Sequence, residues 1–421
     1  MNNNVIIGGG LSGLSLAYHL KNLKKDYLVL EKSSNLGGLC SSIIQDGFTF
    51  DYSGHLLHIK SKYTLDLMGK LLGKNINRIK RDAWVYMQDT FVPFPFQTHL
   101  YGLKKEIASE CVSELLIAYK KDLDRTQLDS FKTWATANFG NGICKYFMFP
   151  YNQKLWGDLD NLTAEWCGKF MPNVNLEDIV KGAYSNSKKA FGYNSYFFYP
   201  KTGGCQTIVD SFVKKLNKNN IKTNYEIKKI NIKNKTLNGE IKYKNLISTM
   251  PLKTLLARVE DLPAKYRAFE RKLKSNTVFV FNFAINREVK PAKHWIYFPE
   301  DKHCFYRIGF QSSFSSANAP KGTTSFYVEV SAKTNKGLEQ KIIKQMQEIG
   351  ILEKQDKVLT KLWLKMEPAY CIYNKDREKI VPEIISYLET RGIYTTGRYG
   401  NWEYSFMEKS ILDSKTLAKT L

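Results

Sequence analysis

The chain has 421 residues, of which 43% are hydrophobic and 13% aromatic, so it can bury substantial cores in two or three domains. No apolar run approaches the roughly 18 residues that a membrane span needs, and the first apolar run lacks the basic leader of a signal peptide. We expect the net charge of +23, which comes mostly from lysine, to reflect a solvated surface. The alternative is attraction to a polyanionic substrate or to an anionic membrane face. No basic–aromatic module accompanies the charge, which argues against nucleic-acid binding.

The first elements in chain order are a strand, a glycine turn, a helix and a second strand. Asn4–Ile7 runs into the turn at Gly8-Gly9-Gly10-Leu11-Ser12-Gly13, and the apolar run Tyr27–Leu30 ends at Glu31. A βαβ start of this kind, closed by an acidic residue, is the pattern that binds the ADP half of a dinucleotide. The alternative is an ordinary glycine-rich turn.

Each residue type in the turn has a role in that interpretation. Gly8 permits the sharp bend, Gly10 lets a pyrophosphate approach the backbone, and Gly13 lets the helix pack on the strand. The N–H groups at the start of the helix, around Leu11 and Ser12, would face the phosphates. Glu31, placed after the second strand, would accept hydrogen bonds from the ribose.

The rest of the chain alternates between helical and strand patterns. A hairpin is expected at 81–98, followed by a mainly helical stretch over about 100–185. Strands are expected at 196–199, 227–230, 239–243, 246–248, 276–284, 294–298, 304–310, 324–331 and 393–396. Helices are expected at 103–120, around 131–139 and 143–147, and at 208–216, 337–349 and 379–390.

These patterns predict an α/β fold with three interleaved domains. Residues 1–80, 200–262 and 385–421 would form a Rossmann-like FAD-binding domain, and 99–185 a mainly helical substrate domain. Residues 81–98, 186–199 and 263–384 would form an antiparallel sheet. The seven cysteines are scattered without a CxxC pair, which is typical of reduced thiols in a cytoplasmic protein and argues against a zinc site. The sequence predicts no oligomeric state.

A second glycine pair favours FAD over a nicotinamide cofactor alone. Lys32 follows Glu31, and Gly37-Gly38-Leu39 gives a second close approach of backbone to an extended dinucleotide. The pattern resembles that of the glutathione-reductase-type FAD enzymes, including amine oxidases and protoporphyrinogen oxidases. The late Gly397-Arg398 resembles their closing segment, which runs beneath the flavin.

Five later segments resemble the UDP-galactopyranose mutases, and in particular the eukaryotic-type branch of that family. The segments, which span nearly the whole chain, are Phe50–His55, Pro93–Gln97, Phe139–Trp156, His294–Arg307 and Gly397–Tyr404. The resemblance implies a flavin-dependent mutase that interconverts the pyranose and furanose forms of a nucleotide-diphosphate sugar for surface polysaccharide biosynthesis. The substrate would be UDP-galactopyranose or a related UDP or dTDP sugar.

The resemblance also implies the chemistry. N5 of the reduced flavin would attack the anomeric carbon and expel the nucleoside diphosphate, and the sugar–flavin adduct would open and reclose through another hydroxyl before the diphosphate returns. The cycle is redox-neutral, and NADH or NADPH are the candidate reductants that prime it.

Site residues follow by matching position. Arg307 would grip the diphosphate, with hydroxyl donors from Tyr370 and Tyr404. His55, after Gly54, would lie near flavin N5 and favour the reduced anion, and Arg398 would contact the flavin or its phosphates. Gln97 and Asn152 would bind the base or ribose. The other substrate-binding candidates are Phe96, Trp156, Trp295 and Tyr297.

The chain departs from the family where substrate identity would be set. Phe149 stands where the family has an arginine before Pro150, Phe94 replaces a tyrosine, and 405–410 replaces a more polar stretch. Lys154, beside the matched motif, is expected to be a solvated lysine.

Two other functions stay open at this point: an FAD-dependent oxidoreductase of the amine oxidase or protoporphyrinogen oxidase type, and a flavin-binding partner without turnover. Each site residue also has a purely structural alternative. Arg307 could be a surface strand residue and His55 a packed loop histidine, and the tyrosines and Trp156 could be core residues.

Overall fold

A parallel sheet carries the start of the chain. In the computed structural model, which describes residues 2–121, 123–171, 174–185 and 195–421, its parallel strands run in the order β18-β12-β1-β2-β9. Their bounds are Ile393–Thr395, Ile241–Ser248, Asn2–Ile7, Leu28–Leu30 and Ile221–Lys222, and the short strands β10 (Ile230–Asn231) and β11 (Thr236–Leu237) extend the β12 edge in antiparallel fashion. Val5, Ile6 and Ile7 are all buried, as expected of a strand covered on both faces.

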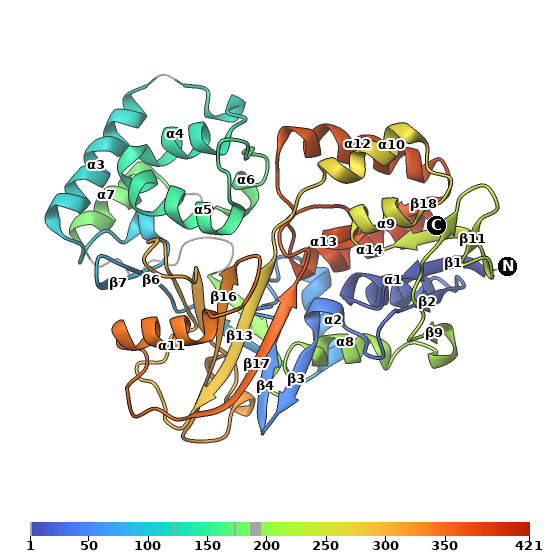
Figure 1. The fold of residues 1–421 in the computed structure, drawn as a ribbon, viewed down its shortest axis with the longest axis horizontal. Coiled ribbons are helices and arrows are strands. Elements are labelled where there is room, and N and C mark those ends of the chain that lie inside the picture. Colours follow the sequence, from blue (N-terminus) through green and yellow to red (C-terminus); the bar gives the residue numbers. More distant parts are fainter. Residues whose placement is uncertain (1, 122, 172–173, 186–194) are drawn as a thin grey trace.

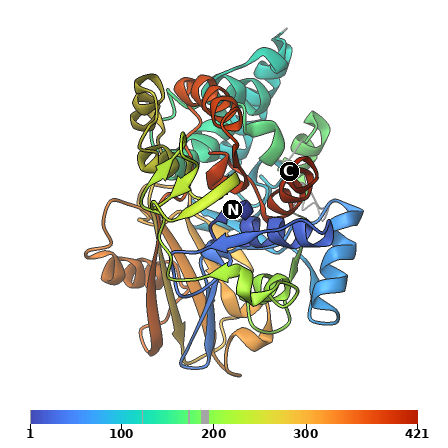
Figure 2. The same ribbon diagram turned by 90° about the vertical axis from the view of Figure 1, so that its right-hand side faces the viewer.

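Helices cover both faces of this sheet (Figures 1 and 2). Ile6 faces a layer made of α1 (Leu11–Asn22), α2 (Lys62–Leu72), α8 (Gln206–Val213) and α14 (Met407–Thr420). Val5 and Ile7 face the opposite layer, made of α9 (Leu252–Arg258) and α12 (Lys375–Glu389), with α10 (Ala264–Lys272) against them. α14 packs along α1, so the end of the chain returns to the glycine turn.

A second sheet is mainly antiparallel and runs in the order β17-β13-β16-β15-β14-β6-β7. The strands span Val358–Met366, Val278–Ile285, Thr324–Ser331, Arg307–Phe310, Trp295–Tyr297, Ala83–Met87 and Thr90–Pro93. One face packs on α11 (Leu338–Glu348), and the other meets the helical region. Because side chains alternate along a strand, Arg307, Tyr327 and Glu329 share the inner face with Val280.

The helical region lies over one end of this second sheet (Figure 1). It contains α3 (Lys105–Lys120), α4 (Phe131–Ile143), a π-helical turn Cys144–Met148, α5 (Phe149–Trp156), α6 (Cys167–Phe170) and α7 (Leu176–Tyr184). α3 and α4 pack closely because Gly140, with φ 71°, and Gly142 bring the α4 backbone against α3.

Short elements join the three parts. The β3 (Ser42–Gln45) and β4 (Phe48–Asp51) hairpin and the β5 (Asn77–Lys80) and β8 (Tyr196–Tyr199) pair link the sheets, and α13 (Gly397–Gly400) follows β18. Residues 186–194, assigned from the sequence to the antiparallel sheet, lie outside the described residues. Within the part of the chain that the structure describes, no helix combines the length and apolar character needed to cross a membrane.

The predicted α/β class is confirmed, and the differences from the predicted elements have physical causes. The two strands predicted at 239–243 and 246–248 form the single strand β12, in which the polar Asn245 bonds Asn4 of β1 at 3.0 Å. β17 was not predicted, because it is an edge strand whose outward lysines interrupt the apolar pattern. α14 was also not predicted as a helix.

Candidate functional site

The glycine turn after β1 has the geometry that its sequence predicts. Gly8 has φ 105°, and a Cβ there would overlap the hydroxyl of Thr249. A Cβ at Gly13 would overlap the carbonyl oxygen of Gly8, so only glycine lets α1 start so close to the turn. Gly10 offers no side-chain cap, which leaves the first N–H groups of α1 facing the adjacent cavity.

The second glycine pair lies directly against the first. Gly37 N donates to Gly9 O at 2.8 Å, and Gly10 pairs with Gly37 in a parallel bridge. A Cβ at Gly10 would lie 3.8 Å from Gly37 O and 3.9 Å from the Cα of Gly38. Two side-chain-free backbone segments therefore form one wall, which an extended dinucleotide can approach closely.

Glu31 is tied to this wall. Its Oε2 accepts a hydrogen bond from Gly9 N at 2.7 Å and its Oε1 from Ser33 N at 2.8 Å. Each carboxylate oxygen can accept a further bond, so the fixed carboxylate is still available to a ribose. The predicted ribose contact stays a prediction.

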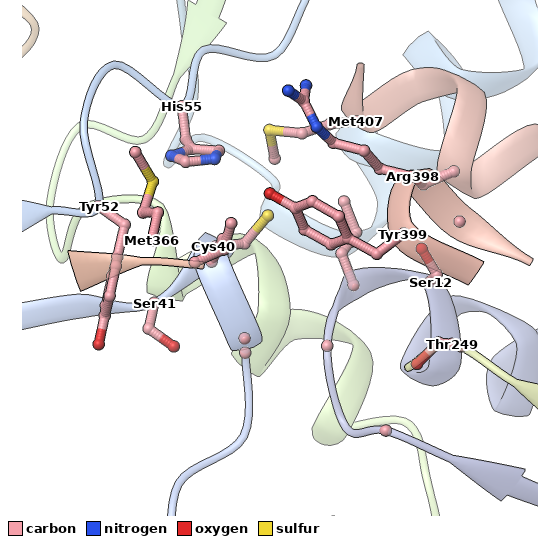
Figure 3. A pocket seen from close by; sticks show the side chains of 18 of the residues that line it. Ser12, Cys40, Ser41, Tyr52, His55, Thr249, Met366, Arg398, Tyr399 and Met407 are labelled. Atoms are coloured by element: carbon pink, nitrogen blue, oxygen red, sulfur yellow. The ribbon is translucent and has the colours of Figure 1, made fainter. Parts of the chain in front are cut away.

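One cavity of about 1320 Å³ runs from the glycine turn to the inner face of the antiparallel sheet. Its lining includes the predicted cofactor residues Gly8, Gly10, Leu11, Ser12, Glu31, Lys32, Gly37, Gly38, Leu39, Gly54, His55, Gly397 and Arg398. Figure 3 shows His55 and the Arg398 guanidinium on one side of this space and Ser12 and Thr249 on another. Gly13 does not line the cavity, because it packs against the turn.

His55 lies on the loop that follows β4. Gly54 precedes it, and a Cβ there would overlap the hydroxyl of Tyr327. Burial, reinforced by the nearby Arg398 guanidinium, lowers the pKa of His55 to about 4. Without a bound anion the imidazole is therefore neutral at pH 7, and it can donate or accept a hydrogen bond. Its buried Nδ1 has no partner among the described residues.

Arg307 is held in an internal ion pair. Its Nε and Nη2 both bond the carboxylate of Glu329, directly across from it on β16, and the Nη2 bond is 2.8 Å long. The hydroxyl of Ser53 donates to the same carboxylate. The Glu329 side chain is only 1% exposed, so its carboxylate is desolvated, whereas Arg307 is 19% exposed at the cavity wall. The alternative of a surface strand residue is wrong, and Nη1 is the donor of Arg307 that these bonds leave for a ligand.

Arg398 differs from Arg307 because its described partners are neutral. Nη1 donates to Ser405 O at 3.0 Å and Nη2 to Ala369 O at 3.1 Å, while the buried Nε has no partner among the described residues. Its guanidinium carbon lies 5.0 Å from the ring centre of Tyr370 and 4.8 Å from that of Tyr404. Burial raises the pKa of both phenols, which stay protonated hydrogen-bond donors.

The predicted substrate residues separate into two groups. Trp295, Tyr297, Arg307, Tyr370 and Tyr404 line the cavity. Phe96, Gln97, Asn152 and Trp156 do not, and they are 0 to 4% exposed in the core shared by the helical region and the sheet.

The contacts of this second group are internal. Asn152 accepts from Trp156 Nε1 at 3.0 Å and donates to Met148 O at 2.7 Å. Phe96 stacks on Phe147, with ring centres 5.2 Å apart. Gln97 Nε2 is buried without a partner among the described residues. A nucleotide can reach these four residues only if the core around α5 opens, so their role stays a prediction.

Three further positions singled out in the sequence, Phe149, Phe94 and Lys154, lie outside the cavity lining. Phe149 packs on Phe131 with ring centres 6.3 Å apart and does not line the cavity, and Phe94 packs on Tyr297 at 4.8 Å. The expectation that Lys154 is solvated is wrong, because its ammonium bonds backbone carbonyls of the loop between β14 and β15.

Sequence reasoning also missed Ser53, Tyr327 and Glu329. Glu329 had a local signal, because it is the one acidic residue in the stretch 324–331. It lies two residues after Tyr327, so both side chains point to the same face of the sheet. Ser53 and Lys154 had none, since their partners lie far away in the chain.

Comparison with known proteins identifies the family. The model for flavin containing amine oxidoreductases matches residues 11–421. The chain belongs to this family. The glycine wall, the open N-terminus of α1 and the anchored Glu31 fit the FAD that membership implies.

Individual relatives are more distant. The UDP-galactopyranose mutase of Mycoplasma pneumoniae is 21% identical over 207 residues, which are 44% of this chain and 50% of that protein. The inactive all-trans-retinol 13,14-reductase of Danio rerio is 43% identical over 70 residues, 15% of this chain and 11% of that protein. The chain thus spans half or less of the length of these curated relatives.

Solved structures give end-to-end matches. A reduced UDP-galactopyranose mutase matches 100% of this chain and 95% of its own, with a TM-score of 0.94 and 27% identity. The cyclohexylamine oxidase of Brevibacterium oxydans matches 100% of this chain and 98% of its own, with a TM-score of 0.67 and 12% identity, which shows the fold alone. The predicted resemblance to the mutases within this superfamily is confirmed.

Proposed function

We propose that this protein is a flavin-dependent mutase that interconverts the pyranose and furanose forms of a nucleotide-diphosphate sugar, UDP-galactopyranose or a close relative. The observation that carries the proposal is the end-to-end match to a reduced UDP-galactopyranose mutase, at a TM-score of 0.94. The product would supply a surface polysaccharide, and NADH or NADPH would supply the electrons that prime the flavin.

The charges at the deep end of the cavity support an anionic ligand. Glu329 neutralises Arg307, whereas Arg398 has only neutral partners among the contacts described, so the three groups leave one buried positive charge. A buried cation without a counter-ion is costly, and a diphosphate or a reduced flavin anion would stabilise it. A protonated amine, the usual substrate of an amine oxidase, would be repelled.

The hydroxyl groups support a sugar diphosphate as well. Tyr370 and Tyr404 keep their protons and lie beside Arg398, where they can donate to phosphate oxygens. Nη1 of Arg307, which lines the same cavity, adds a charge-assisted donor. When bound, a reduced flavin would supply the nucleophile. The aromatic rings of Trp295, Tyr297 and Tyr404 would exclude water from the anomeric carbon.

A direct experiment separates this function from the oxidase alternative. The dithionite-reduced protein is incubated anaerobically with a panel of UDP and dTDP hexoses, and the products are separated by chromatography. We expect one sugar to be converted to its ring isomer. If no member of the panel is isomerised while the oxidised protein consumes oxygen with an amine, the proposal is wrong.

A further inference from the structure

Lys154 lies in α5, between Asn152 and Trp156, and its ammonium reaches across to the loop that joins β14 to β15. Nζ lies 3.0 Å from Phe298 O, 2.9 Å from His303 O and 3.2 Å from Phe305 O, and it also bonds Glu300 O. An ammonium has three N–H donors, so these four converging carbonyls use all of them.

The loop is also anchored on its other sides. Glu300 accepts hydrogen bonds from the backbone and side chain of Gln88, in the turn between β6 and β7. Gln345 of α11 accepts from Cys304 N at 2.9 Å and donates to Lys302 O. The loop therefore keeps its attachment to the sheet and to α11 without Lys154, and among the contacts of the described residues Lys154 provides the hydrogen bonds between this loop and α5.

The strands that flank this loop carry site residues. Tyr297 ends β14, Arg307 begins β15, and the two are register partners. Tyr151, three residues before Lys154, lies edge-on to Tyr297 with ring centres 5.3 Å apart and to Tyr306 at 6.2 Å. α5 thus contacts Tyr297 through the ring of Tyr151, and its Lys154 ammonium holds the loop that joins Tyr297 to Arg307.

We propose that Lys154 is a positioning residue that fixes Tyr297 and Arg307 on the sheet relative to Asn152 and Trp156 on α5. The inference rests on the proposed function, in which the sugar nucleotide contacts Tyr297 and Arg307 in the cavity. Trp156 affects the site through Tyr370 and Tyr404, whose rings lie edge-on to it with centres 5.4 and 5.6 Å away. Burial lowers the pKa of Lys154 to about 8, which agrees with an ammonium whose main partners are carbonyl dipoles. Without the ammonium, the loop and the helix lose their fixed spacing and the substrate must order them on binding.

The test compares Lys154→Met, Lys154→Gln and Lys154→Arg as purified flavoproteins. Methionine keeps a long stem without donors, glutamine keeps two N–H donors without charge, and arginine keeps both charge and donors. We expect KM for the sugar nucleotide to rise about tenfold or more in Lys154→Met, less in Lys154→Gln and least in Lys154→Arg, with kcat changed less than KM in each. If Lys154→Met does not fold, the order of the other two decides.

The matched control is Lys302→Met, which removes an exposed lysine from the same loop and whose ammonium pairs with Asp89 at 2.9 Å. Its KM should equal that of the wild type. Flavin content should be unchanged in all variants. A Lys154→Met or Lys154→Gln protein with wild-type KM, or a fall in kcat at constant KM, overturns the inference.

Binding of UDP, followed by quenching of tryptophan fluorescence, separates failure of this inference from failure of the proposed function. A wild type that neither isomerises sugars nor binds UDP overturns both. If Lys154→Met and Lys154→Gln bind UDP as tightly as the wild type does, the positioning role alone is overturned. Weaker UDP binding in these two variants, restored in Lys154→Arg, supports it.

Discussion

The two ends of the cavity are built in different ways. At one end, glycines of two short segments, Gly8–Gly13 and Gly37–Gly38, form a wall of bare backbone. At the other end, the groups that set charge and hydrogen bonding are side chains from distant strands, such as Arg307, Glu329 and Arg398. The glycine end fits any flavin protein of the family, whereas the arginine end is where one reaction can be separated from another.

The strongest test of this contrast is the buried ion pair. Glu329→Gln leaves the largely buried Arg307 without its counter-charge, so we expect the free energy of unfolding to fall by about 3 kcal/mol or more in urea titrations. The double variant Arg307→Met with Glu329→Leu removes both charges and should recover most of that loss. A double variant as unstable as Glu329→Gln would contradict the pairing.

At the glycine end the effect should come from backbone overlap. Gly13→Ala places a Cβ against the carbonyl oxygen of Gly8, so we expect a loss of about 3 kcal/mol in stability and little retained flavin, measured by absorbance. Gly69→Ala is the matched control, because a Cβ in α2 would meet no atom within 4 Å and should leave flavin and stability intact. Retention of flavin by Gly13→Ala would refute the close-packed turn.

The third prediction concerns pH at the arginine end. The pKa of His55 is about 4 in the folded protein, below its ordinary value near 6.5, so the unfolded chain takes up the proton first as pH falls. The contribution of neutral His55 to the free energy of unfolding is full above pH 6.5. It is lost as the pH falls toward 4, by about 2 kcal/mol between pH 6.5 and 5. His55→Gln should lose less stability than the wild type over this interval, and identical pH dependences would show that His55 is not held neutral.

The smallest effect is expected at Phe149, which replaces the arginine expected from the resemblance to the mutases. Phe149 packs on Phe131 and does not line the cavity. Phe149→Arg should therefore change UDP affinity less than about threefold in a fluorescence titration, which corresponds to about 0.6 kcal/mol. A gain of tenfold or more would mean that this position contacts the diphosphate when substrate binds.

The same contrast explains what the sequence could predict. The glycine turn follows from residues within a few positions of one another, because its function lies in local backbone geometry. Most strands of the antiparallel sheet followed from alternation, whereas its edge strand β17, the β3–β4 hairpin and the short strands β5, β9 and β11 were not predicted. Glu329 lies 22 residues from Arg307, and no local pattern joins them; the ion pair exists only because β15 and β16 are neighbours.

Burial was equally hard to predict for the substrate residues. Gln97 and Asn152 matched the family motif, yet they lie in the core between α5 and the sheet. Lys154 was predicted to be a solvated lysine, because its partners are backbone carbonyls, which have no sequence signature. A motif specifies which residues are present, while the packing of α5 on the antiparallel sheet decides what they contact.

In the proposed function, the arginine end of the cavity serves a redox-neutral rearrangement of a sugar nucleotide. The most direct measurement is the rate of ring isomerisation of UDP-galactofuranose by one preparation, anaerobically, before and after reduction with dithionite. We expect conversion to UDP-galactopyranose only after reduction, with the flavin still reduced after many turnovers. Reoxidation of the flavin in step with product, or no conversion in either state, would contradict it.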